Sequence, residues 1–232
     1  MFLIIDQICK SFGSGESRVQ VLKGIDLQIE KGEFCVLLGP SGSGKSTLLN
    51  IIGGIDKADS GSITIYNEKM DEMNEKKLTL YRRKHLGYIF QMYNLIPNLT
   101  VRENIEVGAY LSEHPLNIDE LLHTLGLWEH QNKLPNQLSG GQQQRCSIGR
   151  AIVKNPDILL CDEPTGALDY HTSKEILKLI ETVNQHYGNT IIMVTHNDAI
   201  KDMADRVVRL RDGMIRDNMK NTVKKSAEEL EW

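Results

Sequence analysis

The hydrophobic pattern of the first part of the chain is that of β-strands. Apolar and polar residues alternate within residues 1–30, notably in Val19–Leu22 and Ile25–Ile29. A period of two favours strands with one buried face. The continuous apolar run Phe34–Leu38 that follows is typical of a buried strand. We therefore expect a β-rich N-terminal unit that leads into a buried strand.

Helices and strands alternate in the next part of the chain. Four apolar residues between Leu48 and Ile52 lie on one face of a predicted helix that stops at Gly53. A charged, mostly exposed helix is predicted over Met70–Lys84. The remaining predicted strands of this α/β pattern are Ser62–Tyr66, Leu86–Phe90, Ile158–Cys161 and Ile191–Val194.

Between Thr100 and Lys154 the pattern changes to that of helices. Capping boxes are predicted at Thr100 with Glu103 and at Ser139 with Gln142, and a looser version at Asn117 with Glu120. An apolar stripe from Ile118 to Leu125 ends at Gly126, and Asn155-Pro156 closes the last helix. We expect one domain over residues 1–232, with a core of 1–91 and 155–232 and a helical insert of about 92–154.

The residue pattern of the C-terminal part predicts one long helix and a hairpin. The helix is expected to be capped by Thr172 and Glu175, with Ile176, Leu179, Ile180 and Val183 facing inward. Val207–Leu210, the turn Asp212-Gly213 and Met214-Ile215 predict a closing hairpin. The polar, charged segment Lys220–Trp232 is expected to be a loosely docked helix.

Composition places the chain among ordinary soluble globular proteins. Its 232 residues are 40% hydrophobic and 25% charged, and a net charge of -4 gives no global attraction to nucleic acid or anionic lipid. No apolar run approaches the ~20 residues of a membrane helix, and Asp6 interrupts the first one, so no secretory signal is expected. The cysteines lack metal-ligand spacing and are expected to be buried free thiols in a reducing cytosol rather than disulfides: Cys9, Cys35, Cys146 and Cys161.

The strongest chemical motif lies between the strand Phe34–Leu38 and the helix that follows it. Glycines at 42 and 44 allow backbone N–H groups to point at an anion, Lys45 supplies a charge for the outer phosphates, and the Ser46 hydroxyl can reach Mg²⁺. The helix N-terminus adds partial positive charge. A glycine-rich turn with an incidental lysine is the alternative, but the strand–loop–helix context favours a nucleoside triphosphate site. The motif consists of Gly39, Pro40, Ser41, Gly42, Ser43, Gly44, Lys45, Ser46 and Thr47.

Two acids end the predicted strand Ile158–Cys161. Asp162 and Glu163 should lie at the carboxyl edge of the sheet, beside the phosphate loop. Asp162 can hold Mg²⁺ directly or through water, and Glu163 can polarise an attacking water. Two acids before a proline turn are common by themselves, so this interpretation depends on the neighbouring loop.

A third motif is Leu138–Gln142. Its capping box contains Gly140 and Gly141, and each glycine costs about 1 kcal/mol relative to alanine in a helix. Glycines at a helix N-terminus make sense where an anion approaches the backbone closely. The alternative is a cap and nothing more.

Together these motifs resemble the ATP-binding cassette (ABC) ATPase subunit of a transporter, in the order that the family has and over nearly the whole chain. The resemblance implies a P-loop NTPase (RecA-like) core with an N-terminal antiparallel β subdomain and an inserted helical subdomain that carries the signature. It also implies a homodimer packed head to tail, with each ATP between one phosphate loop and the partner's signature, Ser139–Gln142. The motifs are Gly39–Thr47, Gln91, Leu138–Gln142, Ile158–Glu163, Ala167–Asp169 and His196.

The resemblance also assigns roles to single residues. Gln91 links the metal and the water to the helical lobe, Glu163 is the catalytic base, and His196 contacts the γ-phosphate. Asp169 communicates across the dimer. Phe12 matches the aromatic residue that stacks on adenine; core packing is the alternative for this side chain. The implied metal ligands are Ser46, Gln91 and Asp162.

Within the family, Tyr88–Pro97 and Glu163–Asp169 resemble the branch of macrolide and antimicrobial-peptide efflux, lipoprotein release and cell-division mechanotransmission. Lys57-Ala58-Asp59 and Tyr170-His171 depart mildly from it. This branch implies a Mg²⁺-dependent ATPase on the cytoplasmic face of a bacterial cell membrane. Its separate permease would dock at Met92–Pro97, where charges at Tyr93 or Leu95 should release it.

Two other classes of function are disfavoured. A soluble ABC protein that acts on DNA or ribosomes would need a coiled-coil insertion or a second cassette, and the sequence contains neither. A plain nucleotide-binding switch would lack Glu163 and the signature. The basic run Arg82-Arg83-Lys84 is expected to be a solvated face, so no nucleic acid is expected as a partner.

Overall fold

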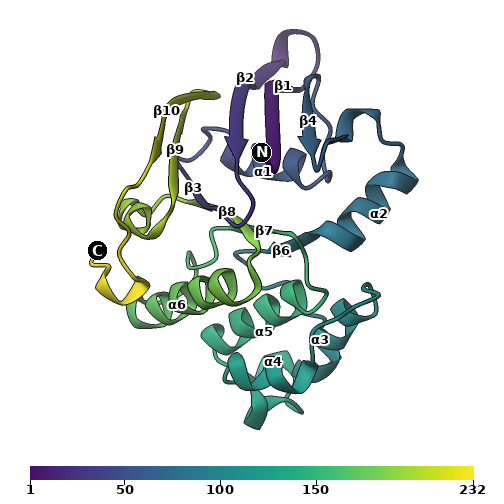
Figure 1. The fold of residues 1–232 in the computed structure, drawn as a ribbon, viewed down its shortest axis with the longest axis vertical. Coiled ribbons are helices and arrows are strands. Elements are labelled where there is room, and N and C mark those ends of the chain that lie inside the picture. The colour runs from purple at the N-terminus through teal and green to yellow at the C-terminus, as the bar shows by residue number, and fades with distance from the viewer.

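Two β-sheets form the upper and central parts of the molecule, and a group of helices lies below them (Figure 1). The computed structural model describes all 232 residues. The first sheet is antiparallel, with the strand order β2-β1-β4-β5. Its strands are β1 (Leu3–Phe12), β2 (Val19–Ile29), β4 (Ser60–Ile65) and β5 (Glu68–Lys69).

The second sheet has the strand order β10-β9-β3-β8-β7-β6. Its strands are parallel except for β10, which closes the edge as a hairpin with β9. Parallel strands need helical crossovers, and these cover both faces. The strands are β3 (Phe34–Leu38), β6 (Leu86–Ile89), β7 (Ile158–Asp162), β8 (Thr190–Thr195), β9 (Arg206–Arg211) and β10 (Met214–Lys220).

The parallel sheet separates two hydrophobic clusters, because successive side chains of a strand point to opposite faces. In β3, Cys35 and Leu37 pack with α1 (Lys45–Ile52) and the antiparallel sheet. Phe34, Val36 and Leu38 pack on the other face. That face is covered by α6 (Tyr170–Tyr187) and the lower helices. The continuous apolar pattern of β3 is thus explained by burial on both sides.

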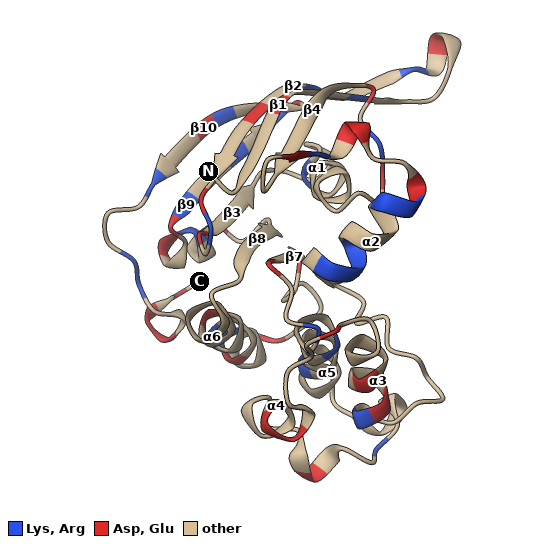
Figure 2. Ribbon diagram, turned by 45° about the vertical axis from the view of Figure 1, so that its right-hand side comes forward, with Lys and Arg blue, Asp and Glu red and all other residues tan.

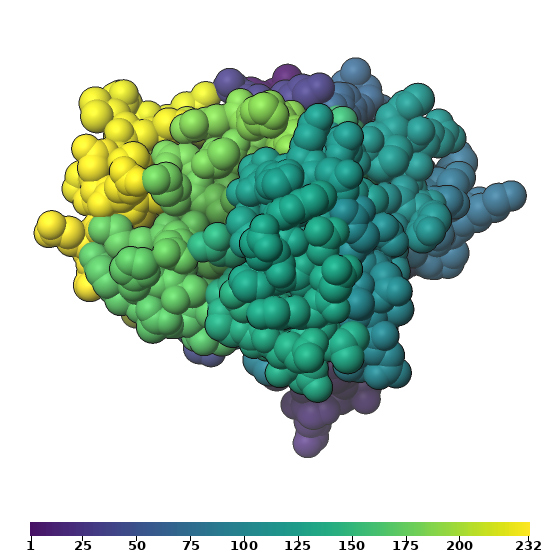
Figure 3. Space-filling model, turned by 90° about the horizontal axis from the view of Figure 1, so that it is seen from below, coloured from purple at the N-terminus to yellow at the C-terminus, as the bar shows by residue number.

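Helix α2 (Glu75–His85) precedes β6. The lower helices come after it, between β6 and β7. They form the teal block at the bottom of Figure 1, and seen from below this block covers the centre of the molecule (Figure 3). The capping boxes at Thr100 and Ser139 are present, and Asn117 caps the middle helix. The limits of about 92–154 given for the helical insert remain a prediction, because one apolar cluster extends from β3 into these helices without a break. The helices are α3 (Val101–Ala109), α4 (Ile118–Thr124) and α5 (Gly140–Ile152).

Three predicted helix boundaries are wrong. The helix expected over Met70–Lys84 begins only at Glu75, because Met70–Glu72 form a 3-10 turn and Asn74 accepts a hydrogen bond from the Lys77 N–H. Helix α6 is capped by Asp169, not by Thr172, whose N–H donates to the Asp169 carboxylate at 3.0 Å. Segment Lys220–Trp232 contains no α-helix.

The C-terminal segment docks more firmly than its polar composition suggests. It forms a 3-10 turn at Ala227–Glu229, and Ala227 and Leu230 are buried in the cluster that includes α6. Lys174 of α6 donates to the carbonyl of Glu228 at 2.8 Å. Two buried apolar side chains therefore hold this segment against α6, together with the hydrogen bond from Lys174.

Other expectations concern thiols, charge and membrane spans. All four cysteines are free, and all but the half-exposed Cys9 are buried; burial raises the pKa of the Cys146 thiol to about 12.

The basic run at the end of α2 (Figure 2) is partly occupied by hydrogen bonds within the chain, since Arg82 donates to the Gly54 carbonyl at 2.7 Å and Arg83 to the Leu111 carbonyl at 3.1 Å. None of the helices is long and apolar enough to cross a bilayer.

Candidate functional site

The phosphate loop connects the end of β3 with the start of α1. Gly42 and Gly44 have φ angles of 77° and 101°, in the left-handed region that favours glycine. A Cβ on Gly44 would lie 2.7 Å from the Leu22 side chain, whereas a Cβ on Gly42 would meet open space. The loop therefore needs glycine at 44 for both packing and conformation, and at 42 for conformation alone.

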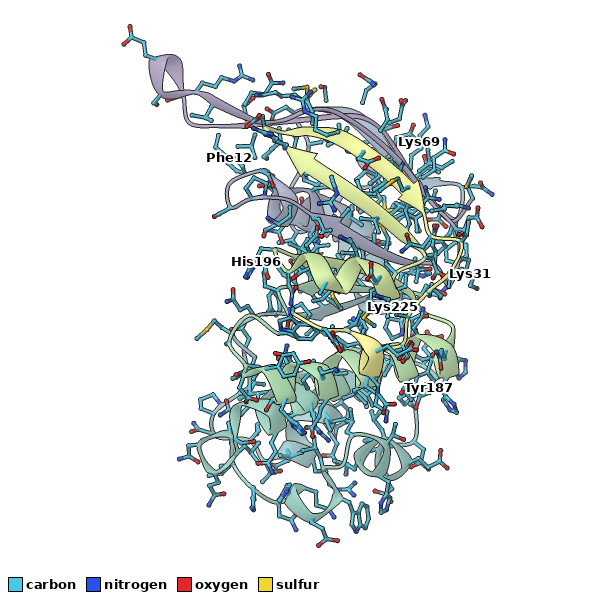
Figure 4. All side chains as sticks on the ribbon, turned by 90° about the vertical axis from the view of Figure 1, so that its left-hand side faces the viewer. Phe12, Lys31, Lys69, Tyr187, His196 and Lys225 are labelled. Atoms are coloured by element: carbon cyan, nitrogen blue, oxygen red, sulfur yellow. The ribbon has the colours of Figure 1, made fainter.

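The loop forms one wall of a cavity of about 540 Å³. This volume is within the range of about 300–1,000 Å³ that is usual for small-molecule sites. Phe12 and His196, which both line the cavity, lie on the same side of the molecule, opposite Lys31 (Figure 4). The lining residues are Phe12, Val21, Ser41, Gly42, Ser43, Gly44, Lys45, Ser46, Thr47, Gln91, Glu163 and His196. The cavity thus unites most of the predicted site residues.

Lys45 is nearly buried at the base of this cavity. The residue is 7% exposed, and its side-chain amine donates to the carbonyls of Gly39 at 2.8 Å and Pro40 at 3.0 Å. Burial lowers the pKa of Lys45, while the charges of Glu163 and Asp162 act in the opposite direction. Because no carboxylate forms an ion pair with Lys45, its charge is available to an anionic ligand.

Hydroxyl and carboxylate oxygens lie beside the loop. Ser46 Oγ donates to Asp162 Oδ1 at 3.0 Å. Burial raises the pKa of Asp162, and the hydrogen bond from Ser46 partly offsets that effect. The Ser43 hydroxyl is buried and has no hydrogen-bond partner, so it can still donate to a phosphate oxygen.

These groups fit a hard cation such as Mg²⁺, which prefers oxygen ligands. The chain contains no cluster of three or more His, Cys, Asp or Glu side chains that could enclose a metal by themselves. Mg²⁺ usually keeps several waters and binds through one or two carboxylates plus substrate phosphates. The serine–carboxylate pair is therefore a suitable partial ligand set, although not a complete one.

Glu163 and His196 form a pair at the edge of the cavity. Glu163 Oε2 lies 2.9 Å from His196 Nδ1; the carboxylate is 18% exposed and the imidazole 70% exposed. Glu163 has a φ of 48°, which is uncommon for a residue with a side chain. Its N–H donates to the Val194 carbonyl and its carbonyl accepts from the Gly166 N–H, both at 3.0 Å.

Gln91 approaches the same acidic turn from β6. The side chain is exposed to the cavity, and its Nε2 would lie 2.8 Å from a Cβ placed on Gly166. Gly166 therefore allows the Gln91 amide to lie against the turn that begins at Glu163. This close approach between segments about 70 residues apart could not be predicted from the sequence.

Phe12 ends β1 and is 46% exposed, so core packing, the alternative interpretation of this residue, is wrong. Lys10 Nζ lies 5.1 Å from the centre of the ring. Val21 on β2 also lines the cavity. The position of Val21 in the cavity could not be predicted, because Val21 is one of several alternating apolar residues in a strand.

The signature residues Ser139–Gln142 do not line this cavity. They form the first turn of α5, in which Ser139 is exposed and Gly141 is buried, and the Ser139 side chain accepts from the Gln142 N–H at 3.3 Å. A Cβ on Gly141 would lie 2.5 Å from Thr172, and one on Gly140 would lie 2.9 Å from the Tyr93 hydroxyl. Packing within the chain thus requires both glycines, in addition to any role at an anion.

A model of the ABC transporter family matches residues 22–166. The chain belongs to this family. Its members bind and hydrolyse ATP. A putative ABC transporter ATP-binding protein of Mycoplasma pneumoniae is 49% identical over 231 residues, which cover 98% of this chain and 50% of that protein. This ABC chain therefore spans about half the length of that relative.

Two further comparisons support the assignment. The bacitracin export ATP-binding protein BceA of Halalkalibacterium halodurans is 43% identical, over 90% of this chain and 84% of BceA. The ATP-binding cassette MJ0796, solved as a dimer bound to ADP and Pi after hydrolysis, has a TM-score of 0.85 and 39% identity, over 94% of this chain and 98% of MJ0796. The predicted α/β fold, with one antiparallel sheet and one parallel sheet, is confirmed.

Proposed function

We propose that this chain is the ATP-hydrolysing subunit of an export system and works with a separate membrane permease. The observation that carries the proposal is that Lys45, Glu163, His196 and Phe12 line one cavity. Resemblance to BceA, a bacitracin export protein, supports export. The substrate would be Mg²⁺-bound ATP, and the products would be ADP and phosphate.

Each group of the cavity has a task in this reaction. The loop N–H groups and Lys45 bind the β- and γ-phosphates, and Phe12 stacks on the base. Glu163 accepts a proton from the water whose oxygen attacks the γ-phosphorus, and the bond to the ADP oxygen breaks. His196 holds the Glu163 carboxylate through the hydrogen bond at Nδ1.

Magnesium would be held by Ser46 and Asp162, with Gln91 as a further oxygen ligand. When bound, the ion offsets phosphate charge. Burial raises the pKa of Asp162, and a bound cation would oppose that effect, because a nearby positive charge favours the ionised carboxylate. Phosphate release by the purified chain should therefore require Mg²⁺ and stop in EDTA. A purified chain that releases no phosphate from Mg-ATP, alone or with its permease, would contradict the proposal.

Replacement of Phe12 tests the base-binding role. Phe12→Ala should weaken ATP binding by about 1–3 kcal/mol, roughly 5- to 150-fold in Kd, since that is the usual contribution of one stacked base. Phe12→Trp should bind as tightly as the wild type. Val19→Ala is the matched control, because Val19 is 61% exposed on the adjoining strand and does not line the cavity. Fluorescence titration with a labelled nucleotide measures the effect; equal affinities for Phe12→Ala and wild type would exclude stacking.

The permease would dock near Met92–Pro97, on the cytoplasmic face of the membrane. Tyr93 and Leu95 are half-buried, and Leu95 packs on the hydrophobic core, so charges there would disturb the fold. Met92 is 70% exposed and Ile96 is 38% exposed, which makes them the better positions to change. An exposed apolar pair of this kind suits a protein partner.

Met92→Glu, alone or with Ile96→Glu, should release the chain from membranes that contain its permease, because a charge replaces an apolar contact. The matched control is Val223→Glu, since Val223 is 82% exposed in the C-terminal segment. Sedimentation of vesicles followed by quantification of the bound chain measures the result. If the Met92 and Ile96 variants stay bound as well as Val223→Glu, the permease docks on another surface.

A further inference from the structure

One buried side chain of α5 connects the two segments that carry Gln91 and Glu163. Gln144 is fully buried, and its Nε2 donates to the Pro164 carbonyl at 2.7 Å. The same nitrogen makes a longer hydrogen bond of 3.4 Å to the Phe90 carbonyl. Pro164 directly follows Glu163, and Phe90 directly precedes Gln91. A single amide therefore holds the main chain beside two residues of the cavity.

The backbone at Glu163 needs such support. With a φ of 48°, Glu163 is in a region that persists only where the surrounding structure determines it. One supporting bond comes from the core, where the Glu163 N–H donates to Val194, and one from the turn itself, where Gly166 donates to the Glu163 carbonyl. The bond from Gln144 fixes the next peptide, so that the direction of the Glu163 carboxylate depends on α5 as well as on the core.

The other end of the Gln144 amide is energetically unfavourable. Its Oε1 is buried and has no hydrogen-bond partner, and a buried unpaired acceptor is unfavourable. Methionine, which has almost the same size and shape, would fill the space without that penalty. The donor function of Nε2 is what an apolar side chain could not supply.

Gln144 also lies one helical turn after Gly140 of the signature. Gly140 and Gln144 are four residues apart on α5 and therefore share a face of the helix. A displacement of the first turn of α5 would consequently act on the Phe90 and Pro164 carbonyls through the Gln144 amide.

We propose that Gln144 is a positioning residue for ATP hydrolysis: it keeps Gln91 and Glu163 in register with each other and with the signature helix. This inference rests on the proposed ATPase function. Gln144 acts through the main chain of the two segments and does not line the cavity. It should therefore affect the turnover number, kcat, and leave nucleotide affinity nearly unchanged.

Gln144→Met removes the donor but preserves the packing. We expect kcat to fall about 10- to 100-fold, the range expected for a small misplacement of catalytic groups. The KM for ATP should stay within about twofold, because Lys45 and the phosphate loop are not touched. The melting temperature should change little, because removal of the unpaired Oε1 offsets the loss of the donor to the Pro164 carbonyl. Phosphate-release kinetics and thermal unfolding measure these quantities.

Ser147→Ala is the matched control. Ser147 is fully buried on the same helix, and its hydroxyl has no partner, so the substitution removes a buried polar group without removing a hydrogen bond. It should leave kcat unchanged. A fall in kcat as large as that of Gln144→Met would mean that any change in the polarity of this buried face slows the reaction, and would overturn the specific role of Gln144.

Gln144→Glu adds a pH test. Burial raises the pKa of a carboxyl group, and only its neutral form can donate to the Pro164 carbonyl. The activity of Gln144→Glu relative to Gln144→Met should therefore be highest at low pH and fall as the pH rises through that pKa. Because ionisation of a buried carboxyl also destabilises the fold, the two variants are compared only at pH values where thermal unfolding shows that both remain folded.

The possible outcomes separate the two proposals. If the wild type hydrolyses ATP and Gln144→Met has the same kcat, the positioning role is wrong and the proposed function stands. If Gln144→Met raises KM and leaves kcat unchanged, Gln144 acts on nucleotide binding, and the positioning role is also wrong. If the wild type releases no phosphate even with its permease, the proposed function fails, and the positioning role fails with it.

Discussion

Lys45→Ala is expected to abolish most ATP binding and turnover. The lysine is nearly buried and has no carboxylate partner, so bound phosphates would be the anions that pair with it. Truncation of one member of a buried charge pair costs about 2–5 kcal/mol, which corresponds to a loss of roughly 30- to several thousand-fold in Kd. Isothermal titration with Mg-ATP measures the change directly.

The control for this experiment is an exposed lysine. Lys76 lies on the exposed surface of α2 and does not line the cavity, so Lys76→Ala should bind Mg-ATP like the wild type. Lys45→Ala itself should remain folded, because its Nζ makes only two hydrogen bonds to carbonyls of its own loop. Unchanged Mg-ATP affinity in a folded Lys45→Ala protein would contradict the role given to this residue.

The core strands and the phosphate loop were predictable because local rules determine them. A buried parallel strand gives a continuous apolar run, and the loop needs glycine where φ is positive, as at Gly44. The capping boxes of α3 and α5 also depend only on residues three positions apart. In each case, the residues that determine the local structure all lie within one short segment of the chain.

Features that depend on distant contacts were not predictable. The sequence interpretation capped α6 at Thr172, because a Thr with Glu three residues later fits the rule, whereas the structure uses Asp169. Asp169 continues the turn that starts at Glu163, and Gln144, from outside the local segment, donates a hydrogen bond to that turn at the Pro164 carbonyl. Likewise, Gln144 looks like one of three ordinary helix-forming glutamines until the fold buries it.

The roles of the two signature glycines illustrate the same limit. The sequence indicated a close approach by an anion, and packing against Thr172 and the Tyr93 hydroxyl is what the fold adds. These contacts come from segments about 30 and 50 residues away in the chain. The glycines therefore cannot by themselves identify an anion site, and the signature role has to be tested on a residue whose side chain is exposed.

Glu163→Gln is expected to bind ATP normally and to hydrolyse it about 10²- to 10⁴-fold more slowly, the usual contribution of a general base. Glutamine keeps the shape of the carboxylate and can still accept a hydrogen bond from His196, but it cannot take a proton from water. ATP that is bound and not cleaved should hold two copies together, because it favours the associated state. The variant should therefore accumulate as a dimer in Mg-ATP, while the wild type stays mostly monomeric.

Addition of Ser139→Arg to Glu163→Gln should abolish that dimer, because the first turn of α5, where Ser139 is exposed, is where the partner's ATP would be capped and a long cationic side chain would block it. The structure adds a necessary control: Ser139 caps α5, and loss of a cap by itself costs about 0.5–2 kcal/mol. Ser139→Ala removes the cap without adding bulk, so Ser139→Ala with Glu163→Gln should still dimerise. Size-exclusion chromatography with light scattering distinguishes the 26.2 kDa monomer from a species of twice that mass. A Glu163→Gln protein that stays monomeric in saturating Mg-ATP, alone and with its permease, would rule out the head-to-tail dimer.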